Sequence, residues 1–182
     1  MNRRIIGSWV SRAHQGRGEK VDSGSIPMIA EAALRIILGL RFLSSGVSNV
    51  RRWPHATETA AIISKRGSVP LGFMATALMV LGGAGLALGL ATPIAALLLI
   101  IFLIPTFQVH RRWLRTLPGQ AAAVAGAIGD GGARSSFRLL QRHAIHAHET
   151  GLQENLVYLA ACLYFLTHGA SGFSIDALIH AR

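Results

Sequence analysis

Residues 71–109 read LGFMATALMVLGGAGLALGLATPIAALLLIIFLIPTFQV, and this stretch contains no Asp, Glu, Lys or Arg. Basic residues stand on both sides of it, at Arg51, Arg52, Lys65 and Arg66 before it and at Arg111, Arg112 and Arg115 after it. Long uncharged runs bounded by Lys and Arg are typical of segments that cross a membrane and end at the headgroups. The stretch therefore predicts an integral membrane protein.

The composition agrees with this prediction. Of the 182 residues 51% are apolar and only 14% are charged, whereas about a quarter of an ordinary soluble domain is charged. The formal net charge is nevertheless +10. Because the basic residues bracket apolar segments and form no separate basic domain, we expect them to contact anionic lipid rather than nucleic acid.

Four segments are long and apolar enough to span a bilayer, which takes about 20 residues. They cover residues 26–50, 71–90, 93–109 and 155–173. Only Ala91 and Thr92 separate the second span from the third, so these two must form an antiparallel hairpin. Thr92 is expected to cap the third helix, and Pro93 suits its first turn. Pro105 is expected to kink that helix.

The connection 110–154 between the third and fourth spans is too long for a simple turn. Residues 126–132 are glycine-rich and are expected to be flexible. Residues 134–148 place Arg134, Arg138 and Arg142 on one helical face and apolar residues on another, the pattern of a basic helix that lies in the membrane interface. Glu154 and Asn155 are expected to begin the fourth helix. The predicted fold class is all-α: a four-helix transmembrane bundle with an interfacial amphipathic helix between helices three and four.

Residues 1–25 form a polar, basic tail with no apolar core of the length that a secretory signal needs, and residues 26–182 form the membrane domain. With four spans both termini share one side of the membrane. That side carries six basic residues: Arg3, Arg4, Arg12, Arg17, Lys20 and Arg182. The other side carries ten: Arg51, Arg52, Lys65, Arg66, Arg111, Arg112, Arg115, Arg134, Arg138 and Arg142. The count places the termini outside the cytoplasm.

The first span contains three charged residues, Glu31, Arg35 and Arg41. A charge near mid-bilayer costs at least about 2.5–3.5 kcal/mol, so a partner must offset it. Glu31 and Arg35 are four residues apart in the order that favours an ion pair within one helix. Two interpretations stay open: a site for an anion, a headgroup or a redox-active ligand at Arg35, or a structural ion pair with side chains that extend toward the interface.

Histidines give the remaining candidates. His168 lies near the end of the fourth span, four residues after Tyr164, and the two can hydrogen-bond. His110 ends the third span, either as part of an interfacial anchor or facing a cavity. His143, His146 and Glu149 have helical spacing that can hold zinc or copper but match no strong metal signature; a wet, His-rich interfacial helix is the alternative.

Several motifs are absent from the sequence. It has no phosphate-binding glycine loop, no dinucleotide fingerprint and no CxxCH haem attachment. Cys162 is the one cysteine, so the chain alone has no dithiol chemistry. We therefore expect no nucleotide and no covalent haem.

Three segments together resemble the DoxX-like family of membrane proteins. Residues 34–46, LRIILGLRFLSSG, resemble that family's first helix. Residues 89–93, GLATP, look like its link between helices two and three, and residues 169–176, GASGFSID, look like its closing turn. The family often has Lys where this chain has Asn49, so any role of that Lys is in doubt here.

The resemblance implies a four-helix bundle in the bacterial inner membrane. Family members have been tied to membrane redox assemblies, including a small subunit of a thiosulfate:quinone oxidoreductase. The first hypothesis is therefore a subunit of a quinone-linked redox complex, with a cleft between the first and fourth helices lined by Arg35, Tyr164 and His168. The second is a non-catalytic scaffold or accessory subunit that binds other membrane proteins. A third, a transporter of a small or lipidic solute, needs a polar path that the uncharged second and third spans hardly provide. The residues leave open whether the chain is itself an enzyme.

Overall fold

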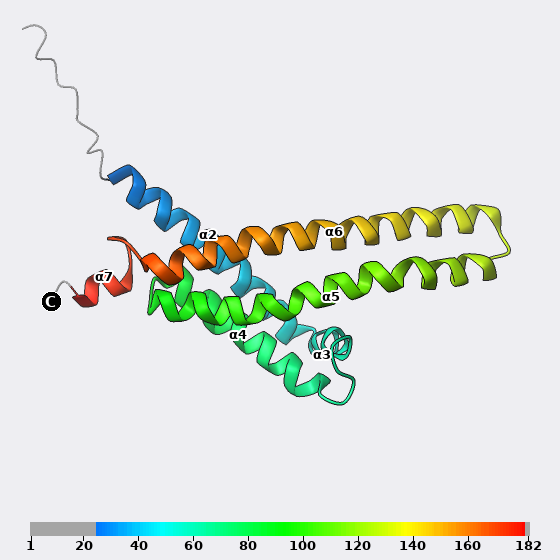
Figure 1. Cartoon of the computed structure of the whole chain (residues 1–182), viewed down its shortest axis with the longest axis horizontal. Helices are drawn as coiled ribbons and strands as arrows, with labels where there is room; N and C mark the ends of the chain where they lie inside the picture. The colour runs from blue at the N-terminus through cyan, green and yellow to red at the C-terminus, as the bar shows by residue number, and fades with distance from the viewer. Residues whose placement is uncertain (1–24, 181–182) are drawn as a thin grey trace, which may run out of the picture.

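The computed structural model describes residues 25–180, and all regular structure in this range is α-helical (Figure 1). The elements are α2 (Ser25–Arg51), α3 (Trp53–Ala61), α4 (Ser68–Leu88), α5 (Thr92–Ala127), α6 (Gly131–His168) and α7 (Ile175–His180). The basic tail predicted for residues 1–25 lies outside this range apart from Ser25.

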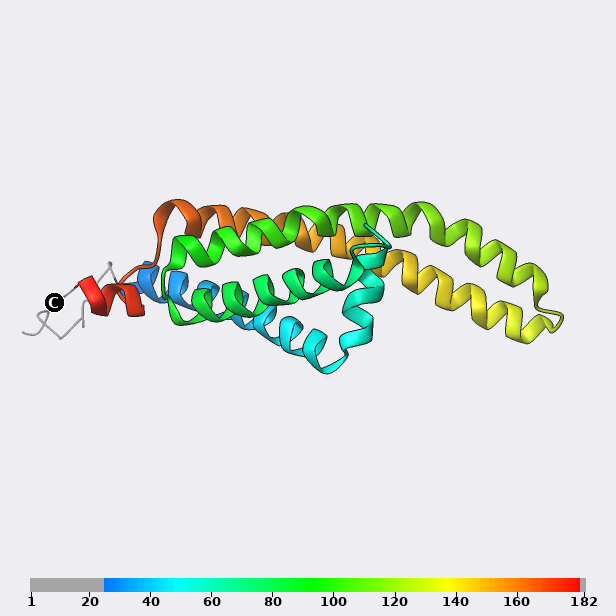
Figure 2. The ribbon, with the colours of Figure 1, turned by 90° about the horizontal axis from the view of Figure 1, so that it is seen from below.

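Helices α5 and α6 form a long antiparallel pair, and α2 and α4 cross beside one half of it (Figures 1 and 2). The main packing contacts are α2 with α4, α4 with α5, and α5 with α6. The other half of the α5–α6 pair extends beyond the bundle, past the short helix α3 (Figure 2).

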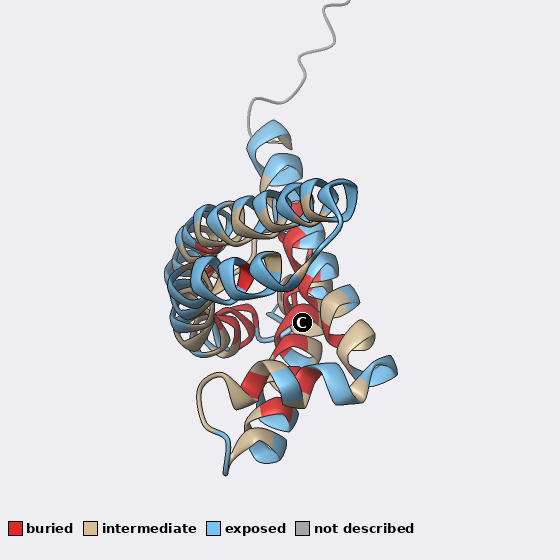
Figure 3. Cartoon of the chain, turned by 90° about the vertical axis from the view of Figure 1, so that its right-hand side faces the viewer, coloured by how far each residue is buried: buried red, intermediate tan, exposed pale blue. Residues whose placement is uncertain are grey.

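The bundle has an apolar interior and an apolar exterior. Leu86, Leu99, Leu103 and Phe165 are fully buried in its core. Large apolar side chains also cover its outer faces, and they include Ile37, Phe73, Leu81, Ile94, Ile104 and Val157, each more than 60% exposed. Figure 3 shows the buried residues gathered where the helices meet. A soluble monomer rarely exposes so much contiguous apolar surface, so these faces suit contact with lipid.

Helices α2 and α4 approach closely at two glycines. A Cβ added at Gly39 would lie 2.4 Å from the backbone nitrogen of Ala87, and one added at Gly83 would lie 2.6 Å from that of Leu43. Helix backbones in membrane proteins approach this closely only where small residues meet. The crossing therefore fixes the position of Arg35, one helical turn from Gly39 on α2.

The tight α4–α5 hairpin is confirmed, and Pro93 lies in the first turn of α5 as predicted. Gly89 ends α4 with a φ of 64°, in the left-handed conformation that favours glycine. The prediction that Thr92 caps α5 is wrong, because no side chain of that turn accepts a capping hydrogen bond. Helix α5 also continues without a break through both Pro105 and Pro118.

The predicted interfacial helix between the third and fourth spans is wrong as a separate element. Residues 134–148 belong to α6, which runs unbroken from Gly131 to His168. The chain between α5 and α6 is only the turn 128–130. Residues 111–127 and 131–150, called the arm below, thus form a two-helix extension. The apolar residues Phe137, Leu140 and Ala144 line an open groove with Leu117 and Val124 of α5, so α5 covers only part of the face that was expected to lie on the membrane; Leu140 is 67% exposed.

Two helices, α4 and α5, are long and apolar enough to cross a membrane among the described residues. Helix α2 matches the first predicted span in length but carries Glu31, Arg35 and Arg41. The apolar part of α6 begins near Asn155 and ends at His168, before the predicted residue 173. Glu154 lies inside α6 and not at its start, so the prediction that it begins a helix is wrong.

Candidate functional site

Arg35 is almost completely buried, with 1% of its surface exposed. Its Nη1 donates to the carbonyl oxygens of Leu86 (2.9 Å) and Ala87 (3.1 Å) in the last turn of α4. Its Nη2 donates to the carbonyl oxygen of Phe173 (2.5 Å), 138 residues away in the chain. One guanidinium thus joins α2, the end of α4 and the segment after α6.

These bonds have a clear physical basis. The last carbonyls of a helix have no partner within the helix and carry partial negative charge, so a cation there is stabilised. Gly89 leaves the space that Arg35 occupies: a Cβ at that position would lie 2.5 Å from the Arg35 Nη1. Arg35 therefore acts as a cap for the C-terminus of α4.

The Glu31–Arg35 ion pair predicted from their spacing is present. The Glu31 Oε1 lies 3.9 Å from the Arg35 Nε, and the Glu31 side chain is 10% exposed. The other oxygen, Oε2, accepts a hydrogen bond from the backbone N–H of Ser171 at 3.0 Å. Glu31 therefore offsets the buried positive charge and also binds the segment that follows α6.

Asp176 caps α5 from a distance in sequence. Its Oδ1 accepts from the Ala91 N–H (2.7 Å) and its Oδ2 from the Thr92 N–H (2.9 Å), while its own N–H donates to the Gly89 carbonyl (2.9 Å). Burial alone would raise the pKa of Asp176, but the two backbone donors and nearby His180 outweigh it, and the pKa is lowered from its ordinary value.

The segment that carries Asp176 is itself held by a local cap. The Ser174 hydroxyl donates to the Ser171 carbonyl and accepts from the Ala177 N–H, so Ser174 caps the short helix α7. Glu31, Arg35, the α4–α5 turn and residues 171–176 together form what is called the Arg35 junction below. Its two Arg35 Nη atoms, the Glu31 Oε2 and both Asp176 oxygens bind backbone groups of the junction, which indicates a structural role. Four buried atoms of the junction have no hydrogen-bond partner within residues 25–180: Glu31 Oε1, Arg35 Nε, Thr92 Oγ1 and Ser171 Oγ.

Tyr164 and His168 face outward, away from the junction. Both are exposed, and their rings stack with centroids 4.5 Å apart. The His168 Nδ1 contacts the Tyr164 carbonyl oxygen (3.2 Å) and the Thr167 hydroxyl (2.9 Å). The structure therefore does not bring this pair together with Arg35 into the expected cleft.

A different pocket, called the polar pocket below, lies between α2, α5 and α6 and has a volume of about 300 Å³. Its lining residues come mainly from these helices: Arg41, Phe42, Ser45, Met79, Phe102, Thr106, His110, Ala147, Gly151, Glu154, Asn155 and Tyr158. His110 is thus the one sequence-predicted site residue that faces a cavity, as one of its two interpretations proposed.

Histidines close one end of the polar pocket. The Nδ1 atoms of His110 and His148 are 3.1 Å apart, so one ring donates its proton to the other. Trp113 stacks on His148 with ring planes 8° apart. Burial lowers the pKa of His148, which favours the neutral form that this pairing needs.

The other polar groups of the pocket lie on α2, α5 and α6. The buried Asn155 donates to the Thr106 hydroxyl (3.0 Å), which in turn donates to the Leu103 carbonyl (2.5 Å). Arg41 donates to the Ser45 hydroxyl on its own helix. Glu154 stands across the same pocket on α6. Arg41 and Glu154 are exposed, so the polar groups that face the bundle are His110, Thr106, Asn155 and Tyr158. Several convergent polar groups beside an apolar core mark this pocket as the strongest candidate binding site.

An apolar cavity of about 280 Å³ adjoins the polar pocket under α3. Met79, Phe102 and Thr106 line both spaces. Its other walls are mostly apolar side chains of α3, α4 and α5, such as Ile63, Leu78 and Val109. A polar chamber beside an apolar one suits a ligand with a polar head and an apolar tail.

The metal candidates lie on the exposed side of the arm. His143, His146 and Glu149 are all exposed, and the one contact among them is the His146–Glu149 pair at 3.8 Å. Within residues 25–180 no three His, Cys, Asp or Glu side chains are placed to hold a metal ion together.

Residues 30–111 match the model of the DoxX family. This stretch is therefore similar to a DoxX domain. This family is membrane-associated, which agrees with the two apolar helices α4 and α5. No curated protein and no solved structure matches the chain.

The matched range runs from α2 to the beginning of the arm, so it includes Arg35, the α4–α5 turn and His110. Helix α6 and residues 171–176 lie outside the matched range. The Arg35 junction and the polar pocket are therefore each completed by residues beyond the domain match, Phe173 and Asp176 in one case and Glu154 and Asn155 in the other.

Sequence reasoning missed the role of Glu154 and Asn155. It placed them at the start of a helix, where a carboxylate has an ordinary electrostatic role. The signal that could have found them is the antiparallel packing of the third and fourth spans, which sets Glu154 near His110 at the same end of the bundle.

Proposed function

We propose that this DoxX-domain chain is a multi-pass accessory subunit of a larger protein assembly in the bacterial inner membrane. The arm carries this proposal. It is an ordered helical extension whose only buried residue is Ala121, and from His110 to Ala127 α5 rises about 26 Å at 1.5 Å per residue. Such an extension adds little to the stability of the bundle, so its use is contact with another molecule.

The surfaces of the two halves support this division of roles. The outer faces of the bundle are apolar and suit lipid or neighbouring membrane helices. The arm instead carries six arginines: Arg111, Arg112, Arg115, Arg134, Arg138 and Arg142. The bundle would therefore anchor the chain and the arm would reach a partner in the aqueous phase.

The test is a chain with a shortened arm. Deleting residues 114–127 and 131–144 while keeping the turn 128–130 removes the end of the arm and leaves Trp113 and His148 in place. We expect this variant to insert in the membrane and keep its bundle, but to migrate on native gels at a lower mass than the full chain purified gently from native membrane. Migration of both chains in one assembly of the same size would contradict the proposal.

A second candidate function is participation in a quinone-linked redox complex, and the polar pocket favours it. His110, Tyr158 and Asn155 can donate hydrogen bonds to ring carbonyls, while Phe42 and Phe102 offer aromatic surface. The adjoining apolar cavity suits an isoprenoid tail. These groups favour a quinone at the polar pocket over one beside Arg35, whose Nη atoms are engaged by backbone carbonyls.

The quinone proposal is tested by the quinone that copurifies with the chain, measured by mass spectrometry. We expect Tyr158→Phe combined with His110→Phe to lower the bound quinone by about tenfold, because two donors are lost. Tyr164→Phe, on the outer face of α6, is the matched control and should retain it. Equal quinone content in all three chains would exclude this pocket as the site.

A further inference from the structure

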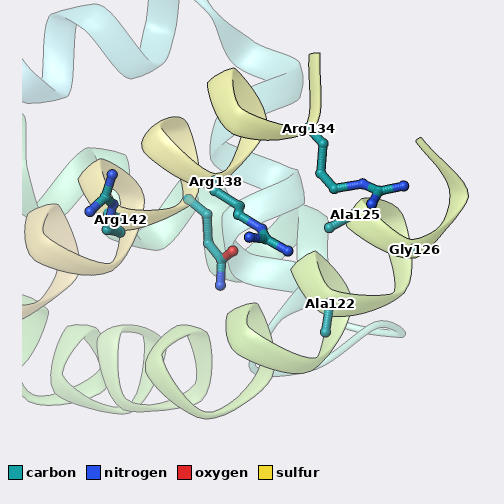
Figure 4. Close-up of a pocket in the computed structure, with 7 residues that line it drawn as sticks. Ala122, Ala125, Gly126, Arg134, Arg138 and Arg142 are labelled. Carbon is teal, nitrogen blue, oxygen red and sulfur yellow. The ribbon is translucent and has the colours of Figure 1, made fainter. Parts of the chain in front are cut away.

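A basic groove lies on the arm, next to the polar pocket but farther toward the tip of the arm. Arg134, Arg138 and Arg142 of α6 form one wall together with Gln141, and Ala122, Ala125 and Gly126 of α5 form the other. Its volume is about 800 Å³. Figure 4 shows these arginines on successive turns of α6, across from the small residues of α5.

The positive charge of the groove is largely uncompensated. Arg134 donates from Nε and Nη2 to the Ile128 carbonyl, but Arg138 and Arg142 have no hydrogen bond or ion pair within residues 25–180. The acids of the arm are engaged elsewhere: Asp130 accepts from the Ala133 N–H, and Glu149 pairs with His146. The guanidinium groups repeat every four residues, about 6 Å along the helix axis.

Most of the groove is too far from the membrane of this chain for lipid to be the partner. On the proposed placement the surface lies near His110 and its partner His148, and Arg142, Arg138 and Arg134 stand about 9, 15 and 21 Å beyond that level along α6. The electrostatic field of anionic lipid decays over about 8 Å at physiological salt. A separate cavity at the root of the arm is lined by Lys65, Arg112 and Arg115. On the proposed placement, these side chains are the ones that can contact lipid headgroups.

The chemistry of the groove points to a protein partner. Its lining contains no aromatic side chain, and aromatic stacking is how proteins usually hold single-stranded nucleic acid. Ala122, Ala125 and Gly126 instead offer a shallow wall against which a helix can pack closely. A second copy of this chain is a poor match, because it has 8 acidic residues against 18 basic ones.

We propose that this groove binds an acidic amphipathic helix of a partner protein, with carboxylates at every fourth residue facing Arg134, Arg138 and Arg142. The inference rests on the proposed accessory function and names the partner's chemistry. Carboxylate–guanidinium pairs match in geometry as well as in charge, and the repeat of the arginines sets the register of the bound helix.

The experiment uses the full chain in nanodiscs of zwitterionic phosphatidylcholine. The probe is a fluorescent helical peptide of Ala, Gln and Glu with Glu at every fourth position, and the control peptide has the same composition with Glu spread over all faces. We expect anisotropy to show tighter binding of the patterned peptide, weakened about tenfold by Arg138→Gln with Arg142→Gln. Arg111→Gln with Arg115→Gln removes the same charge at the root and should change binding less than twofold.

Helicity measured by circular dichroism verifies that both double variants are folded. Equal binding of the two peptides, or equal loss in the two double variants, would overturn the inference. So would preferential binding of an oligothymidine or of phosphatidylglycerol vesicles that is lost with Arg138 and Arg142. If the chain with the shortened arm no longer forms the native assembly, and the patterned peptide also fails to bind the full chain, then the accessory function is supported and the acidic-helix inference fails.

Discussion

Arg35 illustrates how one residue type supports two opposite interpretations. A buried arginine in a membrane segment is costly, and such residues often hold ligands. Here three backbone carbonyls and Glu31 surround the guanidinium. The cost is offset within the chain, which supports the structural interpretation of the pair.

This interpretation predicts that Arg35→Leu destabilises the bundle strongly. The substitution leaves Glu31 without its cation and the end of α4 without its cap, and breaking a buried pair in this way costs about 3–5 kcal/mol. Arg35→Lys should lose less, because one ammonium keeps the charge but cannot reach all three carbonyls. Unfolding in mixed micelles measures both. Arg41→Leu, at an exposed arginine of the same helix, is the control; an Arg35→Leu chain as stable as this control would show that the junction contributes little.

The contacts of Asp176 predict that the stability of the folded chain depends on pH. Its pKa is lowered in the folded chain, so its stabilising effect is complete above the ordinary value near 4 and is lost as the pH falls through the folded pKa. Asp176→Asn removes the charge from the α5 N-terminus and should cost about 1 kcal/mol at pH 7. Thermal unfolding from about pH 7 to pH 3 should show the variant and the wild type converging at low pH. A stability difference that stays constant across this range would contradict the assigned role.

At the scale of elements, the spans were predictable and the arm was not. The predicted spans 26–50 and 71–90 differ from the helices α2 and α4 by only a few residues at each end, since long, mostly apolar runs favour helices. Of these two helices, only α4 is uncharged and apolar enough to count as a candidate span. The arm was missed because Pro118 and Gly119 ordinarily interrupt helices, whereas the glycines of residues 126–132 do mark the turn between α5 and α6. Packing of α5 against α6 overrides these local preferences. Such packing joins distant parts of the chain and cannot be predicted from a local sequence pattern.

The contacts of the candidate site also divide into those that could be predicted from the sequence and those that could not. The Glu31–Arg35 pair and the Ser174 cap follow from spacing within one segment, and both are present. The bond from Arg35 to the Phe173 carbonyl joins segments 138 residues apart. Such a contact depends on how the helices pack, so the role of Arg35 was not accessible from one helix alone.

The N-cap of α6 gives a prediction about the local stability of the arm. Asp130 precedes α6, and its Oδ2 accepts from the Ala133 N–H at 2.5 Å. Asp130→Ala should cost about 1 kcal/mol and allow the first turn of α6 to fray, whereas Asp130→Ser, which can still cap, should cost less. Hydrogen exchange followed by mass spectrometry should be faster in residues 128–137 and unchanged in α4. Equal acceleration in arm and bundle would mean that the two unfold as one unit.

The whole molecule combines an apolar bundle with a basic arm, and this polarity has a consequence for orientation. On the proposed multi-pass placement, ten Lys and Arg residues of the sequence would lie on the side that carries the arm, and six on the side of the termini. The excess favours an arm in the cytoplasm, because basic segments near a span are retained there. An acidic helix that binds the arm would then belong to a cytoplasmic domain or protein.

Site-directed labelling tests this orientation in intact cells. Ser135→Cys places a thiol on the arm, and Leu178→Cys places one on α7, where the native side chain is 69% exposed. The native Cys162 is buried and should stay silent. A maleimide that does not cross the inner membrane should label Leu178→Cys in intact cells and Ser135→Cys only after the membrane is opened. The reverse pattern would place the arm and its partner outside the cytoplasm, and labelling of both sites in intact cells would contradict a bundle that separates them by a membrane.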